Sequence, residues 1–565
     1  MEVSIRIAGA AGQGIQTAAE LLGKIVTRSG LWASCVNDAE SRIRGGLNFS
    51  HLRLGDRPRE GVSERIDGLL ALTQRAVDEL AGGLAADGVL VGPHDRPHPH
   101  RLAIDLEDLA RQSGNPKTLA VVALGVCCGL LGLDRSLVEA AVRERFGSSP
   151  KLAEANHRAI QLGMDAGQAA APDRFRMAQT SDSAHRLWLY GHEALSLGAV
   201  AGGVSFVAGY PMSPSTSILT DLSEWSRALG MVVLQAEDEI AAINMVAGAS
   251  YAGARAMTAT SGGGFCLMTE GVSLLGMIEQ PAVIVIGQRP GPATGLPTRT
   301  AQNDLHLALH AGHGSFPRLI LAPRDVSDGF EMGARAFDLA ERFQIPVFVL
   351  TDQQLQDAQA TVAPFETGSL PGKRHLADPS SLPEGQPYRR FALTPDGISP
   401  QLAPGASPHL VVVDSDEHDE TGHMIESAAL ATAMAEKRIA RERTLASAGW
   451  LFPPSLLDIG PDRPLVVSWG SSFVTLREAK EQLAREGFAF GHLHLRQLWP
   501  LPRTELGHWL RQGSQLLVVE NNPQGQLEHL LPRVTERKVD RAIRRLDGRP
   551  LTVEQLVRDL KENLR

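Results

Sequence analysis

The middle of the chain alternates short apolar runs with longer stretches in which apolar residues recur at helical spacing. The apolar runs are rich in β-branched residues, and each is followed by a helical pattern. This alternation is typical of a parallel sheet covered by helices. Strands are predicted at residues 204–208, 231–234, 256–260, 282–286 and 347–350.

Similar patterns flank this unit. At the N-terminus a predicted strand at residues 3–8 leads through a glycine-rich turn into a predicted helix at residues 15–29. Further apolar runs there suit a doubly wound sheet, with strands at residues 32–36, 68–72 and 89–91. Near the C-terminus, strands are predicted at residues 465–469, 492–495 and 516–519, with a helix at residues 475–486. The predicted fold class is therefore α/β, in three α/β domains.

Composition changes mark the domain boundaries. We place the first domain at residues 1–172, where an Ala- and Gly-rich linker ends, the second at residues 180–445 and the third at residues 450–565. Within the second, residues 360–410 are rich in Pro, Gly and Ser, which predicts an extended, irregular segment on the surface.

Composition also argues against several classes of protein. The 565 residues carry 55 Lys and Arg against 64 Asp and Glu, a formal charge of −9 that gives no electrostatic reason to expect nucleic-acid binding. The longest apolar run, residues 119–133, is short for a membrane span and contains three glycines. The N-terminus runs directly into a strand and lacks the pattern of a signal peptide. We expect a cytoplasmic protein with no membrane role.

The spacing of the four cysteines matches no pattern that is typical of metal sites or of a disulfide framework. No C-x-x-C pair occurs, and adjacent Cys127 and Cys128 point to different sides of a helix or strand. We expect all four to be reduced and buried, and no iron–sulfur cluster on this chain.

Three acidic residues stand where the strand at residues 231–234 passes into a helical segment rich in Ala and Gly. Acids at a helix start commonly cap free N–H groups or complement the helix dipole, which can account for Glu237 and Asp238. Glu239 is followed by small residues that allow close approach of another backbone or a flat ligand. A desolvated carboxylate there suits proton sharing with a ring nitrogen, so Glu239 is the first candidate for a catalytic group.

Two loops after the predicted strands carry groups that can bind anions. Pro211 and Pro214 stiffen the loop around Ser213, whose hydroxyl either donates to a carboxylate or oxyanion or caps the next helix. Ligands of open α/β sheets bind at this end of the strands. Arg289 and Arg299 lie in a Gly- and Pro-rich loop, where they either grip a substrate carboxylate or remain solvated.

A histidine group follows the second loop. His306, His310 and His313 are close in sequence but have no acidic partner that would complete a metal site. We interpret them as structural residues or as neighbours of the substrate, and we predict no metal ligands in this chain.

The N-terminal turn has the spacing G-x-x-G-x-G at Gly9, Gly12 and Gly14. It is either a tight structural turn, a site for a phosphate-bearing ligand such as coenzyme A, or a dinucleotide site with Asp38 at the ribose. Nearby, Arg44 belongs to a basic loop that is either solvated or docks an anionic ligand or a neighbouring subunit.

Together these motifs resemble the α subunit of 2-oxoacid:ferredoxin oxidoreductases, in the form with a γ domain fused at the N-terminus. The resemblance extends over nearly the whole chain and includes a thiamine diphosphate pyrimidine-binding domain and a transketolase C-terminal type domain. Gly397-Ile-Ser-Pro400 and Asp416-Glu-His-Asp-Glu-Thr-Gly-His423 look most like the 2-oxoglutarate enzymes.

The resemblance assigns roles to individual residues. Glu239 matches the glutamate that holds N1′ of the aminopyrimidine, Ser213 stands where the family has Thr, and Arg299 matches an arginine that binds a substrate carboxylate. Met212 stands where the family has Ile. The cofactor contacts implied by the resemblance are Tyr210, Pro211, Met212, Ser213, Glu239, Ser261 and Gly262.

The resemblance also implies partners, because this chain has no GDG motif followed by Asn for Mg²⁺ and pyrophosphate and no cysteine set for a cluster. In the family both lie on a β subunit, so thiamine diphosphate is expected at an interface of an αβ or (αβ)₂ assembly. The implied reaction converts 2-oxoglutarate, coenzyme A and oxidised ferredoxin to succinyl-CoA, CO₂ and reduced ferredoxin, or runs in reverse. Three alternatives remain: the same reaction on pyruvate, branched-chain or aryl 2-oxo acids, a non-catalytic scaffold, and an NAD-dependent enzyme.

Overall fold

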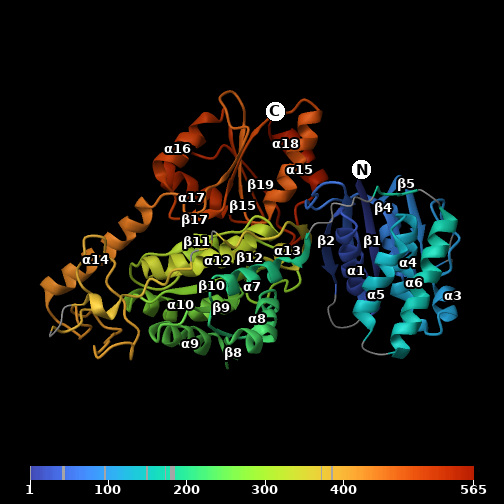
Figure 1. The fold of residues 1–565 in the computed structure, drawn as a ribbon. Coiled ribbons are helices and arrows are strands. Elements are labelled where there is room, and N and C mark those ends of the chain that lie inside the picture. Colours follow the sequence, from blue (N-terminus) through green and yellow to red (C-terminus); the bar gives the residue numbers. More distant parts are fainter. Residues whose placement is uncertain are drawn as a thin grey trace. The chain divides into compact units, whose positions relative to one another are not determined.

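The computed structural model describes residues 2–40, 45–93, 97–147, 150–171, 174–178, 185–368, 370, 372–382 and 386–564. The chain forms two compact units, which Figure 1 shows coloured along the sequence. Unit 1 comprises Met1–Tyr190, Asp357–Pro364 and Thr552–Glu554, and unit 2 comprises Gly191–Gln356, Phe365–Leu551 and Gln555–Arg565. The three described sheets are each accompanied by helices, which confirms the α/β class. The boundaries of the three domains stay predictions.

Unit 1 is built on a sheet in the order β5-β4-β1-β3-β2-β13-β6. Its strands are β1 (Glu2–Ala11), β2 (Trp32–Ala39), β3 (Gly45–Gly55), β4 (Ile66–Ala71), β5 (Leu84–Val91), β6 (Leu187–Tyr190) and β13 (Gln359–Val362). Its helices are α1 (Ile15–Arg28), α2 (Gln74–Leu80), η1 (Ala81–Gly83), α3 (Leu106–Gln112), η2 (Pro116–Thr118), α4 (Leu119–Leu130), α5 (Arg135–Phe146) and α6 (Pro150–Ala170).

This sheet is mixed, whereas the sequence predicted a doubly wound parallel one. Strand β3, which the sequence analysis did not predict, pairs antiparallel with both β1 and β2. It therefore separates Asp38 on β2 from the glycine turn after β1, an arrangement unlike the dinucleotide-binding one, in which the ribose acid follows the neighbouring strand. The structure thus disfavours the NAD alternative.

The apolar run at residues 119–133 packs helix against helix inside unit 1. A Cβ atom at Gly125 would lie 2.6 Å from the carbonyl oxygen of Ile160, and one at Gly163 would lie 2.4 Å from that of Val122. The glycines therefore let α4 and α6 touch backbone to backbone. Among the described helices none is both long and apolar enough to cross a membrane.

Unit 2 contains a second sheet in the order β17-β11-β12-β10-β9-β7-β8, parallel except for β17. Its strands are β7 (Phe206–Gly209), β8 (Val232–Gln235), β9 (Ala256–Thr260), β10 (Ala282–Gln288), β11 (Leu319–Leu321), β12 (Pro346–Asp352) and β17 (Gln497–Trp499). The accompanying helices are α7 (Gly191–Ala201), α8 (Thr216–Leu229), α9 (Glu239–Tyr251), α10 (Gly262–Met277), α11 (Leu305–His310), α12 (Val326–Phe343) and α13 (Gln353–Asp357).

Successive strand residues face opposite sides of this sheet. On β10, Val283 and Val285 pack with residues of α7, α8 and α12, whereas Ile284 and Ile286 pack with residues of α9, α10 and α11. Helices thus cover both faces, as predicted for a parallel sheet. Cys266 is exposed, contrary to our expectation, because it lies on the outer face of α10 with Gly263, Leu267 and Glu270.

The rest of unit 2 holds a third sheet in the order β14-β16-β15-β18-β19. Its strands are β14 (Ser455–Leu457), β15 (Leu465–Trp469), β16 (Gly491–Leu495), β18 (Leu516–Glu520) and β19 (Arg541–Arg544). The remaining helices are η3 (Pro379–Ser381), α14 (Ala428–Ser447), α15 (Ser472–Arg485), α16 (Arg503–Gln512), α17 (Gln526–Thr535) and α18 (Val553–Asn563). Apolar residues of this sheet and of α10 belong to one continuous core, so the two sheets form one unit.

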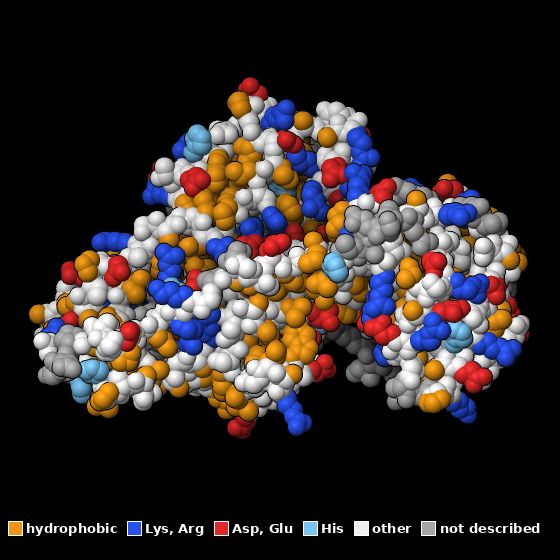
Figure 2. All heavy atoms as spheres, viewed as in Figure 1, with side chains coloured by type: hydrophobic (Ala, Val, Ile, Leu, Met, Phe, Trp, Pro, Cys, Tyr) orange, Lys and Arg blue, Asp and Glu red, His pale blue; other side chains and the backbone are white. Residues whose placement is uncertain are grey.

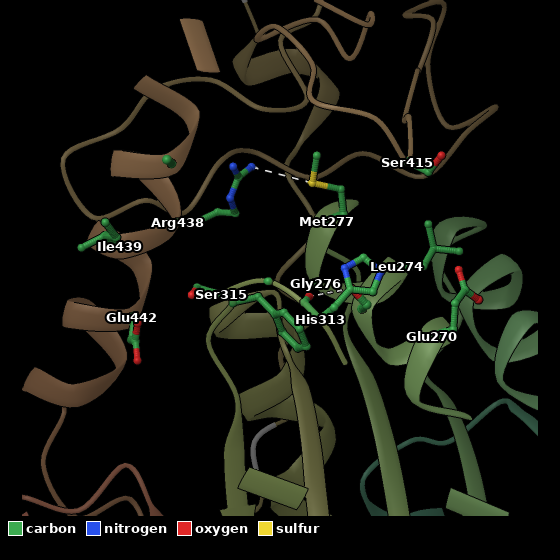
Figure 3. Close-up of a pocket in the computed structure, with 14 residues that line it drawn as sticks. Glu270, Leu274, Gly276, Met277, His313, Ser315, Ser415, Arg438, Ile439 and Glu442 are labelled. Atoms are coloured by element: carbon green, nitrogen blue, oxygen red, sulfur yellow. Dashed lines mark hydrogen bonds between the residues drawn. The ribbon is translucent and has the colours of Figure 1, made fainter. Parts of the chain in front are cut away.

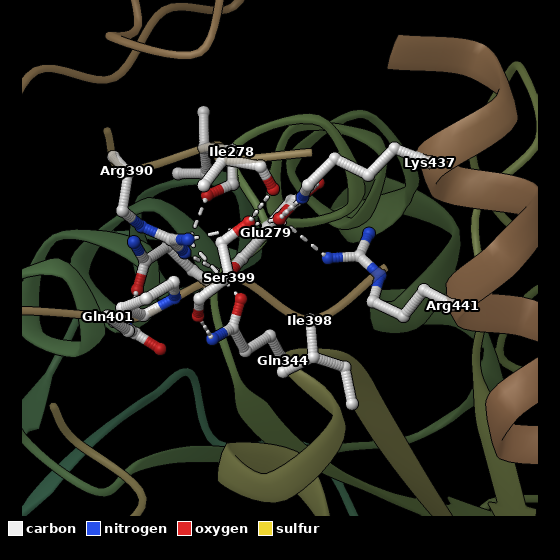
Figure 4. Close-up of polar contacts among 12 residues, drawn as sticks. Ile278, Glu279, Gln344, Arg390, Ile398, Ser399, Gln401, Lys437 and Arg441 are labelled. Atoms are coloured by element: carbon white, nitrogen blue, oxygen red, sulfur yellow. Dashed lines mark hydrogen bonds and ion pairs between the residues drawn. The ribbon is translucent and has the colours of Figure 1, made fainter. Parts of the chain in front are cut away.

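A buried cluster of charges lies beyond the C-terminal end of α10 (Figure 4). The carboxylate of Glu279 accepts hydrogen bonds of 2.7 and 2.6 Å from Lys437 on α14, and Arg441 lies 3.1 Å away. Arg390, from the long segment before α14, donates to the carbonyl oxygen of Glu279 at 2.7 Å and to Gln344 at 3.3 Å. Burial raises the pKa of Glu279, but Arg441, Lys437 and Arg390 together bring it down to about 2.

Replacing Glu279 should strongly destabilise the chain. Glu279→Gln keeps the shape but leaves three buried cations without their carboxylate, and breaking such a cluster costs about 3–5 kcal/mol. Chemical denaturation followed by circular dichroism measures the loss. Glu536→Gln is the matched control, because its pair with Arg503 is exposed, with 79% and 64% of the side chains accessible. That pair should contribute less than about 1 kcal/mol; equal losses in both variants would contradict the role of the cluster.

Candidate active site

The loops that follow β7, β8, β9 and β10 meet at the carboxyl ends of the strands of the parallel sheet of unit 2, because parallel strands end on the same side. The residues that meet there surround the first turn of α10. This turn begins Gly262, Gly263, Gly264 after Ser261 at the N-cap position. Because these three glycines have no Cβ atoms, side chains from the neighbouring loops can approach the turn closely.

Glu239 occupies the position that the sequence predicted, at the first residue of α9 after β8. Its neighbours differ from it: Asp238 caps the helix by accepting a hydrogen bond of 2.7 Å from the backbone N–H of Ala241, and Glu237 is exposed. The alternative of an ordinary helix-start residue therefore holds for Asp238. Glu239 is only 3% exposed, and its Oε1 has no hydrogen-bond partner in the part of the chain that the structure describes.

The carboxyl group of Glu239 lies against Gly264. A Cβ atom at Gly264 would be 2.6 Å from Oε1 of Glu239 and 2.2 Å from Oγ1 of Thr260. The Oγ of Ser261 is also buried without a partner among the described residues. Buried polar atoms are normally hydrogen-bonded, so two such atoms on one glycine turn indicate a place prepared for a ligand.

The Ser213 loop and Arg289 reach the same turn. The Sδ of Met212 would be 4.0 Å from a Cβ atom at Gly263, and Arg289 donates a hydrogen bond of 2.7 Å to the carbonyl oxygen of Ser213. Burial lowers the pKa of Arg289, and the charge of Asp304 opposes this. Arg289 is thus an ordered, half-buried cation and not a solvated loop residue.

Ser215 holds these loops together, a role that the sequence analysis did not assign. Its hydroxyl donates a hydrogen bond of 2.6 Å to the carbonyl oxygen of Thr260 and accepts one of 3.1 Å from the N–H of Gly287. It lies at the N-cap position of α8, but its side chain does not cap that helix. The loop after β7 is therefore tied to the ends of β9 and β10.

Asp304 is a second buried carboxyl group at this turn, and the sequence analysis did not single it out. A Cβ atom at Gly262 would be 2.4 Å from its Oδ1, and its Oδ2 is buried without a partner among the described residues. Burial raises the pKa of Asp304 to about 7, although Arg289 opposes the rise. No local pattern distinguishes it from an acid that simply caps a short helix.

No contact with this turn is recorded for the other predicted residues among the described part of the chain. Arg299 packs beside Gly548, where a Cβ atom would be 3.0 Å from that of Arg299. Tyr210 is 38% exposed and Pro211 is also exposed. The ring of His306 stacks on that of His529 with centroids 6.1 Å apart, and burial lowers its pKa, which agrees with a structural role.

The glycine turn of unit 1 borders a cavity of about 470 Å³. Gly12 and Gly14 adopt positive φ angles of 89° and 84°, and α1 begins after Gly14 without a side-chain cap. The cavity lies at the ends of the parallel strands β1, β4 and β5 and is lined by Gln13, Thr73, Gly92, Asp105 and Glu107, among others. Arg44, the predicted anion-binding partner of this turn, lies outside the described residues.

A cavity of about 530 Å³ lies at the other end of α10 (Figure 3). Met277, Phe316 and Ile439 line it with Arg438 and His313. Arg438 pairs with Glu417 at 2.6 Å and also contacts the Sδ of Met277 at 3.8 Å. The α10 residues that line this cavity begin at Glu270, about 12 Å along the helix from Gly262, so the cavity and the turn at the start of α10 are distinct.

Comparison with known families places domains along the chain. Residues 4–166 match the family "Pyruvate ferredoxin/flavodoxin oxidoreductase", residues 197–437 match "Pyruvate flavodoxin/ferredoxin oxidoreductase, thiamine diP-bdg", and residues 464–556 match "Pyruvate:ferredoxin oxidoreductase core domain II". Glu239 and the glycine turn therefore lie within a thiamine diphosphate-binding domain.

Individual relatives extend the match to the whole chain. The 2-oxoacid:ferredoxin oxidoreductase subunit alpha of Sulfolobus sp is 30% identical, over 98% of this chain and 96% of its own length. The 2-oxoglutarate synthase subunit KorA of Archaeoglobus fulgidus is 34% identical over 61% of this chain and 90% of its own. The structure is similar to that of 2-oxoglutarate:ferredoxin oxidoreductase from Magnetococcus marinus, with a TM-score of 0.92, 29% identity and full coverage of both chains.

These matches confirm the resemblance drawn from the motifs and the α/β fold. The chain belongs to the family of 2-oxoacid:ferredoxin oxidoreductase α subunits, with the γ-type domain at its N-terminus.

Proposed function

We propose that this chain is the α subunit of a 2-oxoglutarate:ferredoxin oxidoreductase that forms succinyl-CoA, CO₂ and reduced ferredoxin, or runs in reverse as a carboxylase. The observation that carries the catalytic part is the buried Oε1 of Glu239 beside Gly264, which has no hydrogen-bond partner among the described residues. Two relatives support the choice of substrate: the 2-oxoglutarate synthase subunit KorA of Archaeoglobus fulgidus, and the Magnetococcus marinus enzyme, whose structure has 2-oxoglutarate, coenzyme A and succinyl-CoA bound.

The residues around Gly262, Gly263 and Gly264 suit thiamine diphosphate. When bound, this cofactor supplies the nucleophilic carbon and the electron sink that decarboxylation of a 2-oxo acid needs. Glu239 would hold the proton at N1′ of the aminopyrimidine, which satisfies its orphaned oxygen. Tyr210, Pro211, Met212, Ser261 and Gly262 would form the surrounding wall.

The substrate would bind beside Ser213. The carboxylate of the 2-oxo acid would pair with Arg289, because Arg289 is already held against the Ser213 loop by a hydrogen bond. Arg299, in the same loop, would supply a second cation for the distal carboxylate of 2-oxoglutarate. A guanidinium can bind a carboxylate with two parallel hydrogen bonds, so two arginines favour a dicarboxylate.

A β subunit would complete the site and carry Mg²⁺, the pyrophosphate site and the [4Fe-4S] cluster. Strand β8 is the edge of its sheet, yet Val232 and Leu234 are 49% and 44% exposed. Ile240, Met245 and Leu267 on α9 and α10 are also exposed. Hydrophobic side chains reach the surface of this unit around α8 and β8 (Figure 2). An exposed hydrophobic surface on the unit that carries Glu239 favours a permanent subunit interface in an αβ or (αβ)₂ assembly. Ferredoxin would be a further partner.

Coenzyme A would bind at the glycine turn of unit 1. Gly9, Gly12 and Gly14 precede the uncapped start of α1, where free N–H groups attract phosphate. The adjoining cavity of about 470 Å³ offers room for part of such a ligand. Arg44 would add a positive charge.

Removing the negative charge of Glu239 should nearly abolish turnover. In the purified αβ complex, Glu239→Gln cannot control the proton at N1′, so kcat should fall by about 10²–10⁴, whereas exposed Glu237→Gln should stay close to wild type. Steady-state reduction of ferredoxin measures both. Retained activity in Glu239→Gln would support the alternative of a non-catalytic scaffold.

Two neighbouring glycines provide a matched pair of variants. Gly264→Ala puts a methyl group 2.6 Å from Oε1 of Glu239 and 2.2 Å from Oγ1 of Thr260, whereas the nearest atom at Gly263 is 3.9 Å away. Crowding of this kind costs about 1–3 kcal/mol. We expect Gly264→Ala to bind thiamine diphosphate at least about 10-fold more weakly in calorimetric titration of the complex. Gly263→Ala should fold as stably as wild type, and equal weakening in both would contradict the geometry.

Substrate choice is tested by competition between 2-oxo acids. The complex should show kcat/KM for 2-oxoglutarate at least about 10-fold above that for pyruvate, branched-chain or aryl 2-oxo acids, since one further buried charge pair is worth more than about 1.4 kcal/mol. Equal kcat/KM for pyruvate would overturn the assignment to 2-oxoglutarate and leave the family membership intact.

A further inference from the structure

Asp304 is a buried carboxyl group that no step described so far uses. It precedes α11, but its side chain does not cap that six-residue helix. Its backbone N–H donates to the side chain of Gln288 at 3.0 Å, so the residue is fixed in place at the end of β10. Helix capping therefore does not account for the carboxyl group.

Among the described residues, Arg289 is the counter-charge that acts on Asp304. The carboxyl group packs on the Cα atom of Gly262, where only glycine leaves space for it. The groups that act on it electrostatically are Arg289, from the loop after β10, and Cys266 on α10, whose thiol pKa is raised by burial and by the Asp304 charge. His306, two residues further along, is the remaining titratable neighbour on its own segment.

With Arg299 assigned to the distal carboxylate, the guanidinium of Arg289 faces two acids once substrate is present: Asp304 and the 2-oxo acid carboxylate. Without ligand, the carboxylate of Asp304 is the negative charge that opposes the lowering of the Arg289 pKa by burial. A 2-oxo acid brings a second carboxylate to Arg289, and two carboxylates that share one desolvated site cannot both remain ionised at little cost. One of them must take up a proton, and the more weakly acidic one does so.

We propose that Asp304 takes up one proton from solvent when a 2-oxo acid binds beside Arg289, and that its O–H group then donates a hydrogen bond to the bound carboxylate. This inference rests on the proposed function, because it requires the substrate to bind at the Arg289 loop. Asp304 is in this account a positioning residue: it sets the pH range in which the pocket accepts an anion and takes no part in bond breaking. The orphaned Oδ2 is the atom that gains the partner.

The pKa of Asp304, raised by burial to about 7, sets the expected pH dependence. Below pH 7 the group is largely protonated before substrate arrives, and binding releases or takes up few protons. Above pH 7 the protonated fraction falls, about fivefold between pH 7 and pH 8 and about tenfold per unit beyond that, so the apparent Kd should rise by the same factors. Proton uptake per site should be about one half at pH 7 and approach one at pH 8.

The test is calorimetric and needs no turnover. N-oxalylglycine and oxamate are non-reacting analogues of the dicarboxylate and monocarboxylate 2-oxo acids. Each is titrated into the purified αβ complex loaded with thiamine diphosphate, at pH 7 and pH 8, in two buffers that differ in ionisation enthalpy. The difference in apparent binding enthalpy between buffers gives the number of protons taken up.

Asp304→Asn is the central variant, since the amide keeps the shape and cannot ionise. It should lose the proton uptake, and its Kd should change less than about twofold between pH 7 and pH 8, because the amide removes the group whose protonation is linked to binding. His306→Gln is the matched control, because it removes the titratable side chain two residues further along the same segment; it should keep the uptake. Uptake that persists in Asp304→Asn, or that is missing from wild type at pH 8, would overturn the inference.

A second measurement covers the case in which Asp304→Asn fails to assemble. The infrared difference spectrum of the wild-type complex should gain the band of a protonated carboxyl group when N-oxalylglycine is added at pH 8. An unchanged spectrum in that region would overturn the inference on wild-type protein alone.

The two proposals fail in different ways. Turnover retained by Glu239→Gln with proton uptake still present would overturn the catalytic proposal only. Turnover lost in Glu239→Gln with no uptake in wild type would overturn the Asp304 inference only. Absence of binding by both analogues would overturn the Asp304 inference, and turnover of Glu239→Gln would still decide the catalytic proposal.

Discussion

The site depends on the missing Cβ atoms at the start of α10. Gly262 and Gly264 let two carboxyl groups, those of Asp304 and Glu239, lie against one helical turn at distances that any larger residue would prevent. Both groups are buried, and each has an oxygen without a partner in the described part of the chain. Burying polar atoms in this way costs free energy that the folded chain does not recover by itself. The arrangement makes physical sense when a ligand supplies the partners.

The two ends of α10 show how counter-charges determine what a buried acid does. Beyond its C-terminal end, Glu279 is surrounded by Lys437, Arg390 and Arg441, and its pKa falls to about 2. At its N-terminal end, burial raises the pKa of Asp304 to about 7, because Arg289 is the one cation among the described residues that opposes the rise. The first acid anchors the long segment before α14 to the sheet and should remain ionised. The second can change its charge near neutral pH, which allows its protonation to respond to a bound anion.

The sequence predicted most of what is local. A strand followed by acids and then by small residues at helical spacing was enough to separate Glu239 from Asp238, and the structure confirms the cap made by Asp238. What the sequence could not show depends on distant contacts. Strand β13 pairs with β2, more than 300 residues earlier in the chain, and β3 converts a predicted parallel sheet into a mixed one. Asp304 is buried because its loop returns to Gly262, and Ser215 matters because it bridges β9 and β10. No spacing within the sequence encodes either contact.

The central claim is that Glu239 of this chain activates thiamine diphosphate held together with a β subunit. Its most direct measurement is the rate at which deuterium replaces the C2 proton of thiamine diphosphate bound to the αβ complex, followed by quenched-flow NMR. The account predicts rapid exchange in the wild-type complex and exchange slower by orders of magnitude in Glu239→Gln, with the cofactor still bound. Equal exchange rates in the two complexes would contradict it.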